Sequence, residues 1–283
     1  MHAPRTTDPI EPELLMLAYR SGIFPMADSR DDPDIFWIEP RLRAIIPLDG
    51  LHVSHSLART LRRNRFTVTC NEAFSMVMDA CAAPRPARSQ DECLDDDDDE
   101  GGSWISHRIQ RSYENLHRLG LAHSIECWRE SADGTARELV GGLYGVGFDR
   151  AFCGESMFST TSDSSKVALC WLVAAMRRGG ATLLDCQFMT PHLASLGAQE
   201  LPQKDYLKLL QAAQSGEPGD QFAALSPSGA GTGSVSTASS TGSASEGALS
   251  LPDAFAALLE DAAAAGLSSS PGKLIAQALT QTS

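Results

Sequence analysis

The sequence predicts an α/β (α+β) protein, because its central stretch, Leu139 to Gln187, contains predicted strands on both sides of a predicted helix. The stretch opens with two glycine-rich apolar segments joined by a turn at 149–150, a pattern typical of a β-hairpin. Apolar residues then recur at helical spacing after Asp163 or Ser164, either of which can cap the helix. An apolar segment, 181–188, follows as a buried strand.

This last strand contains an acidic residue. Side chains two positions apart face the same side of a strand, so Asp185 and Gln187 should point together and Cys186 should point away. Burying a carboxylate is costly unless it is paired or used. Two interpretations follow: a structural carboxylate bonded to neighbouring amides, or, together with Glu155, the polar floor of a site for an amine-bearing or cationic substrate.

The chain before this stretch is predicted to contain a small N-terminal domain, residues 1–45, followed by a larger domain, residues 46–213. Pro12 to Ser21 has the spacing of a short amphipathic helix. Phe36 and Trp37 begin a strand-like segment, and their aromatic rings are expected to belong to a core.

A basic helix is predicted from His52 to Arg65, a segment that contains no acidic residue. Positions spaced by three and four lie on one helix face, so the basic side chains gather there. Such a face is usually just solvated, but it also suits contacts to RNA phosphates. The residues on this face are His55, Arg59, Arg62 and Arg63.

The remaining elements of the larger domain follow from similar patterns. We expect strands at 66–71 and 123–128, helices at 72–81 and 106–119, and a helix or turn from 190 to 198.

The charge of the chain is concentrated in appendages. The net charge is −13, of which an acidic run at 91–100 contributes eight negative charges and the segment after residue 215 contributes −5, which leaves a neutral body. Proline and like charges predict a disordered insertion at about 84–102. Residues 214–250 read as a flexible linker, and 251–283 as a possible helical tail within a disordered C-terminal extension. Insertion and tail are expected to be dispensable, because neither contains enough apolar surface to join a core.

Cysteine usage and the N-terminus predict a soluble, cytoplasmic protein without a membrane partner. The seven cysteines show no CxxC spacing, which favours free thiols and argues against a zinc site. No signal peptide and no membrane-length apolar segment are present in the sequence.

Ten motifs resemble, in order and spacing, those of the leucyl/phenylalanyl-tRNA–protein transferase family over about Leu14 to Leu210. They are YRSGIFPM, FWIEPR, SWI, YENLHRLGLAHSIECW, LVGGLYGV, FCGESMFS, SSKVAL, LLDCQ, HLASLGA and LPQKDYL. The resemblance implies a GNAT-like acyltransferase core with a small N-terminal domain. It also implies transfer of Leu or Phe from aminoacyl-tRNA to proteins that begin with Arg or Lys, which marks them for N-degron degradation. We expect a monomer.

The resemblance assigns roles to individual residues. Asp185 orients or deprotonates the attacking amine, Gln187 holds it, and Glu155 supports both. The aminoacyl pocket would be formed by Leu143, Phe152, Met157 and Leu172, and tRNA would be bound by Trp37, His55, Arg59, Arg62, Arg63 and Trp104. Such a pocket discriminates a methylene by only about 1–3 kcal/mol, so Met should also be accepted. Gln203 stands where the family usually has arginine.

No cofactor is expected. The sequence has no glycine-rich pyrophosphate loop between a strand and a helix, which argues against coenzyme A. No metal is expected either.

Two alternatives from other functional classes stay open. A serine hydrolase would use Ser156, but Phe158 occupies the place of the second glycine in the nucleophile-elbow pattern. A non-catalytic tRNA-binding module would bind RNA through the basic helix without transferring an amino acid.

Overall fold

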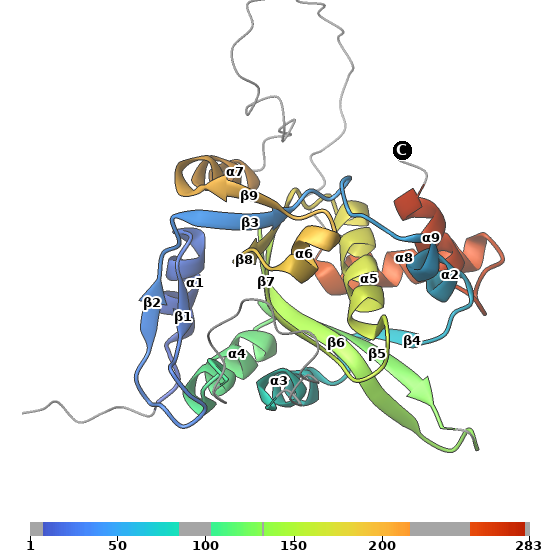
Figure 1. Ribbon diagram of the computed structural model, residues 1–283, viewed down its shortest axis with the longest axis horizontal. Coiled ribbons are helices and arrows are strands. Elements are labelled where there is room, and N and C mark those ends of the chain that lie inside the picture. Colours follow the sequence, from blue (N-terminus) through green and yellow to red (C-terminus); the bar gives the residue numbers. More distant parts are fainter. Residues whose placement is uncertain (1–7, 85–102, 132, 216–249, 281–283) are drawn as a thin grey trace, which may run out of the picture.

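A seven-stranded sheet forms the centre of the protein (Figure 1). The computed structural model describes residues 8–84, 103–131, 133–215 and 250–280. One pair of neighbouring strands, β7 and β8, runs parallel, and the other neighbours are antiparallel. The strands in spatial order are β4 (Thr67–Cys70), β5 (Ala122–Glu130), β6 (Arg137–Phe148), β7 (Ala151–Ser159), β8 (Leu183–Gln187), β3 (Leu42–Ile46) and β9 (Gln199–Pro202). The predicted α+β class is confirmed.

Helices cover both faces of this sheet and enclose two apolar cores (Figure 1). The first core lies under α2 (His55–Arg62), α5 (Ser164–Arg178), α8 (Leu251–Ala264) and α9 (Gly272–Thr280), with the short α6 (Pro191–Ser195) at its edge. The second lies under α1 (Pro12–Arg20), α3 (Phe74–Ala82), α4 (His107–Arg118) and α7 (Gln203–Ser215). We call them the α5 core and the α4 core.

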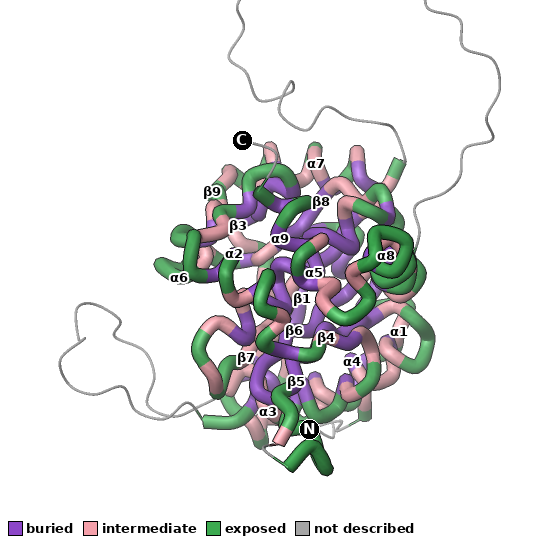
Figure 2. The backbone as a smooth tube through the Cα atoms, turned by 90° about the vertical axis from the view of Figure 1, so that its right-hand side faces the viewer, coloured by how far each residue is buried: buried purple, intermediate pink, exposed green. Residues whose placement is uncertain are grey.

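Helix α5 is the most deeply buried helix, and almost all of its residues are inaccessible (Figure 2). Its start lies so close to β6 that a Cβ atom at Gly141 would be 2.2 Å from the Ser164 hydroxyl. The glycine-rich sequence of β6 is therefore explained at this point by close helix-on-strand packing.

The N-terminal part forms its own two-stranded sheet, β1 (Phe24–Met26) with β2 (Phe36–Ile38). It contacts the larger sheet through Phe24, whose ring lies under Arg43 of β3 and stands edge-on to Phe188, the residue after β8, at a centroid distance of 5.6 Å. The predicted helix and strand of this part are confirmed. The expectation that the Phe36 and Trp37 rings belong to a core is wrong: both side chains are exposed, because the two-stranded sheet leaves this part of β2 uncovered. Sequence patterns did not reveal β3 and β9, which are short, or α7, of whose 13 residues only Tyr206, Leu210 and Ala213 are buried.

The C-terminal tail is part of the folded body. Phe255, Leu258 and Ile275 are buried in the α5 core. The expectation that the tail lacks apolar surface to join a core is therefore wrong: these residues are spaced so that each tail helix has one continuous apolar face. The acidic run and most of the linker, residues 85–102 and 216–249, lie outside the described residues.

Within the described ranges, no helix combines the length and apolarity needed to cross a bilayer. The six cysteines in these ranges are free thiols.

Candidate active site

The polar residues of interest lie where β7 and β8 stop pairing. The two strands pair through three residue pairs, the last being Cys153 with Asp185. Two residues further along each strand stand Glu155 and Gln187, and the Gln187 Nε2 atom donates a hydrogen bond to Glu155 Oε1 at 2.8 Å. A side-chain bridge thus replaces the backbone ladder at this point.

A β-bulge directs Glu155 into this position. In the β6–β7 pair, Gly145 is opposite Gly154 and Tyr144 is opposite Ser156, so Glu155 has no partner on β6. An extra residue of this kind bends the strand and redirects its side chain, a device common beside functional sites. A Cβ atom at Gly145 would lie 2.2 Å from the Cys153 carbonyl oxygen, so the bulge requires glycine there.

Three buried tyrosines surround the Glu155 carboxylate. The Tyr113 hydroxyl donates to Glu155 Oε2 at 3.1 Å and also contacts the Tyr19 hydroxyl. Tyr144 stands edge-on to Tyr113 with ring centroids 5.7 Å apart, and its hydroxyl has no hydrogen-bond partner among the described residues. The carboxylate therefore lies among aromatic rings, with neutral hydrogen-bond donors and no cationic partner among the contacts described for it.

This setting changes the protonation of Glu155. Burial raises the pKa of Glu155 to about 7 from the usual 4.5. Hydrogen bonds from Tyr19, Gln187 and Tyr113 act in the opposite direction, and the negative charge of Asp185 adds to the increase. A carboxyl group with this pKa can both accept and release a proton near neutral pH.

Asp185 lies in a different environment. Its side chain is fully buried, and Arg43 donates to it from Nε at 2.9 Å and from Nη2 at 2.6 Å. The Tyr206 hydroxyl donates at 2.9 Å, and the backbone N–H of Gln187 donates at 2.8 Å. Both carboxylate oxygens are occupied by donors.

Arg43, like Asp185, is fixed by several contacts. Its guanidinium donates to the Gly22 carbonyl at 3.0 Å and lies over the rings of Phe24 and Tyr206 at 4.8 and 4.5 Å. Burial alone would lower the pKa of Arg43, but the charge and hydrogen bonds of Asp185 outweigh burial and raise it. Sequence reasoning missed Arg43 and Tyr206. The one available signal was a single arginine in the apolar segment LRAII.

The predicted orientation of β8 is confirmed. Asp185 and Gln187 contact side chains around the α4 core, whereas Cys186 packs against the α5 core. Gln187 adopts a left-handed conformation with φ of +63°, which is unusual for a residue other than glycine. The hydrogen bond from its N–H to Asp185 stabilises this turn and aims its side chain at Glu155.

The four residues predicted to form the aminoacyl pocket lie together, but on the other face of the sheet. They belong to or border the α5 core, where all except the half-buried Met157 are fully covered. The sheet, at the point where the β7–β8 pairing ends, separates these side chains from the carboxylates. The residues are Leu143, Phe152, Met157 and Leu172.

The predicted tRNA-binding residues fall into two places. The basic face of α2 is exposed, and the Ser54 side chain caps the helix by accepting from the Leu57 N–H at 3.2 Å. Trp37, which is 42% exposed, lines a surface groove of about 670 Å³. Trp104 is half-buried, and its carbonyl accepts from the Ala27 N–H at 3.2 Å.

The structure gives no support to a serine hydrolase. Ser156 makes no hydrogen bond to a histidine within the part of the chain that the structure describes. His123 is bound to Asn71 at 2.9 Å, and burial together with the charge of His117 lowers the pKa of His123 to about 4. His117 bonds to the Ala122 carbonyl at 2.8 Å, so both histidines have structural roles.

Comparison with known proteins identifies a family for the chain. Residues 45–211 match the family model of leucyl/phenylalanyl-tRNA protein transferase, and residues 8–41 match the model of its N-terminal domain. The tail lies beyond both matches.

Proteins named leucyl/phenylalanyl-tRNA–protein transferase are similar to this chain over most of their length. One from Novosphingobium aromaticivorans is 58% identical over 278 residues, which cover 97% of each chain. One from Zymomonas mobilis is 49% identical over 209 residues, covering 74% of this chain and 71% of the relative. One from Rhizorhabdus wittichii is 52% identical over 204 residues, covering 72% and 75%. The chain therefore belongs to the leucyl/phenylalanyl-tRNA protein transferase family, a family of aminoacyltransferases.

Proposed function

We propose that the protein transfers Leu or Phe, and also Met, from aminoacyl-tRNA to the N-terminal amine of acceptor proteins that begin with Arg or Lys. The observation that carries this proposal is the Glu155–Gln187 bridge at the end of the β7–β8 pairing. It offers one carboxylate, poised to exchange a proton near pH 7, next to a primary amide. An amine nucleophile needs these two groups: one to hold it and one to remove its proton.

Gln187 is oriented to hold the amine. An ionised carboxylate only accepts hydrogen bonds, so the Gln187 Nε2 atom must face Glu155 and the Oε1 atom must face elsewhere. That oxygen is then available to accept from the attacking amine. Its position is fixed at both ends, by the bond to Glu155 and by the bond from the Gln187 N–H to Asp185.

Glu155 takes the proton in this mechanism. The amine attacks the ester carbonyl of the aminoacyl-tRNA, a C–N bond forms, and the bond to the terminal ribose oxygen breaks. The amine proton passes to Glu155, and Glu155 returns it to the ribose oxygen, which leaves as a hydroxyl. Because the ester is already activated, orientation and transfer of one proton provide most of the rate, and no covalent enzyme intermediate is required.

Asp185 acts as a positioning residue. Its oxygens already accept from Arg43, Tyr206 and the Gln187 N–H, and its side chain is fully buried. Because these donors occupy both oxygens, we assign the proton transfer to Glu155 and not to Asp185. Its contribution is to fix the left-handed turn at Gln187.

We assign the two proposed substrates to opposite faces of the sheet, at the point where the β7–β8 pairing ends. The Leu or Phe side chain would pack among Leu143, Phe152, Met157 and Leu172 once these covered side chains move apart, and apolar contact there favours it over polar residues. On the other side, the ionised Glu155 attracts a cationic acceptor terminus. N-degron marking, a monomeric state and action in the cytoplasm complete the proposed role.

A transfer assay tests the function. We expect radiolabelled leucine to pass from Leu-tRNA to peptides that begin with Arg or Lys, and not to the same peptides after N-acetylation, since acetylation removes the nucleophile. Binding of tRNA without transfer would identify an RNA-binding module instead. Release of free leucine independent of peptide would identify a hydrolase.

The basic face of α2 is proposed to bind tRNA phosphates. Replacing Arg59, Arg62 and Arg63 with alanine should weaken aminoacyl-tRNA binding, and the slope of log K against log salt should flatten by roughly 0.7–0.9 for each lost phosphate contact. The matched control is Arg118→Ala, an exposed arginine on α4 on the opposite side of the sheet. An unchanged affinity and salt slope in the triple variant would show that α2 is only a solvated surface.

A further inference from the structure

The C-terminal helix pair, α8 and α9, contacts α5 at its middle and at its C-terminal end. The Phe255 ring packs on Trp171 at a centroid distance of 5.1 Å. At the end of α5, Arg178 Nε donates to Asp261 at 2.7 Å and Arg177 donates to the Ala278 carbonyl at 3.2 Å. The helix pair is thus an integral layer of the protein, although it lies beyond the residues that match the family model.

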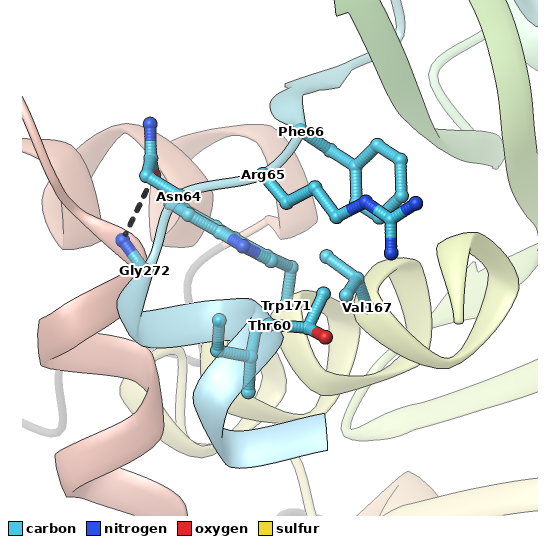
Figure 3. A pocket seen from close by; sticks show the side chains of 8 residues that line it. Thr60, Asn64, Arg65, Phe66, Val167, Trp171 and Gly272 are labelled. Atoms are coloured by element: carbon cyan, nitrogen blue, oxygen red, sulfur yellow. Dashed lines mark hydrogen bonds between the residues drawn. The ribbon is translucent and has the colours of Figure 1, made fainter. Parts of the chain in front are cut away.

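The start of α9 meets the end of α2 backbone to backbone. The Gly272 N–H donates to the Asn64 side chain at 3.4 Å (Figure 3). A Cβ atom at Gly272 would lie 2.4 Å from the Leu61 carbonyl oxygen, so only glycine fits at this contact. Trp171 and Val167 of α5 border the same point, and the free space left there is about 10 Å³, no more than one water molecule needs.

Helix α2 depends on this support. It has eight residues, and its inner face consists of Leu57, Ala58 and Leu61. A helix this short is marginal in isolation, so its packing partners determine its stability and its direction. Those partners are chiefly α9, with a smaller contribution from α5. The outer face of α2 has the exposed arginines, so we expect a displacement of α9 to move them.

We propose that the C-terminal helix pair is a positioning element for tRNA binding: it holds α2 so that its arginines meet the phosphates in one fixed arrangement. This inference rests on the proposed RNA-binding role of α2. It assigns Gly272 and Asn64 as the residues through which the helix pair acts. The C-terminal helix pair therefore supports the transfer reaction by positioning α2, although it does not itself contact the substrate.

The test uses Gly272→Ala in the full chain, with Gln277→Ala on the exposed face of α9 as its control. We expect the KM for aminoacyl-tRNA to rise by roughly 5–30-fold, because a displaced helix keeps its charges but loses their arrangement. The kcat at saturating aminoacyl-tRNA should stay at the wild-type value, and hydrogen exchange of the α2 amides should accelerate. A second variant, Asn64→Gly, serves if Gly272→Ala fails to fold. Glycine tolerates the φ of +49° at position 64 and removes the side-chain acceptor, so this variant should also raise the KM and accelerate hydrogen exchange.

Two results overturn the proposal, and both are distinct from failure of the proposed function. Unchanged hydrogen exchange of α2 in both variants would show that the helix pair does not hold it. Faster exchange with an unchanged KM, while the triple arginine variant has a raised KM, would show that α2 binds RNA without needing the helix pair. An unchanged KM in the triple arginine variant would instead overturn the RNA-binding role of α2, and with it the inference.

Discussion

Replacing Glu155 with glutamine should slow single-turnover transfer by roughly 10²–10⁴-fold, the range typical of a lost general base. Glutamine has the same shape, and its amide can still bond to Gln187 and Tyr113, so the bulge and the tyrosine cluster should persist. The substituted side chain at position 155 can no longer accept a proton. Binding of aminoacyl-tRNA should change little, because the proposed phosphate contacts lie on α2.

The neighbouring Ser156 provides the matched control. It lies on the same strand directly after the bulge, and Ser156→Ala should leave the rate close to that of the wild type. Near-normal transfer by a folded Glu155→Gln enzyme would contradict the proposed proton acceptor. A large loss in Ser156→Ala would instead point to a nucleophilic serine.

The pH dependence of stability provides an independent measurement on the same variant. The pKa of Glu155 in the folded protein, about 7, is above the usual 4.5 because of burial, so the folded state favours the protonated form. This contribution to stability is complete below about pH 4.5 and is lost as the pH rises through about 7. We therefore expect wild-type melting temperature to fall relative to Glu155→Gln across this window, and a constant difference would contradict the shifted pKa.

Local patterns predicted most of the elements that build the site. The β6–β7 hairpin, α5 and β8 each have a continuous apolar signal and clear end signals, and all were found where expected. By contrast, β3 and β9 are short, and the pairing of β3 with β8 and of β9 with β3 is a long-range event that no local pattern encodes. The apolar spacing of the tail helices was visible in the sequence. Because the apolar face is small, the sequence did not predict that it packs against α5.

The chemistry of the site was only partly predictable, because it depends on long-range partners. Period-two alternation placed Asp185 and Gln187 on one face of β8, and the glycines pointed to irregular backbone near Glu155. The different roles of the two acids did not follow from alternation. They arise because Arg43 reaches Asp185 from β3, across 142 residues of sequence, whereas a bulge turns Glu155 towards buried tyrosines.

The buried ion pair leads to the largest expected effect on stability. Asp185→Asn leaves the Arg43 guanidinium in the interior without its counter-charge, and breaking such a pair typically lowers the free energy of unfolding by about 3–5 kcal/mol. That is a large fraction of the roughly 5–15 kcal/mol that stabilises a typical domain. Cys186→Ser, whose side chain packs on the other core, is the positional control and should have a smaller effect.

A double-variant cycle separates the structural role of Asp185 from a catalytic one. Arg43→Met should destabilise the protein for the same reason as Asp185→Asn, by leaving one buried charge unpaired, and the combined variant should be less destabilised than the sum of the two. Urea unfolding of the three variants measures this coupling. At a temperature where Asp185→Asn is folded, this variant should retain most of the wild-type rate of single-turnover transfer, because it keeps Glu155, the proposed proton acceptor. If Asp185→Asn is instead as stable as the wild type but transfers 10²–10⁴-fold more slowly, Asp185 is the proton acceptor and the role assigned to Glu155 is wrong.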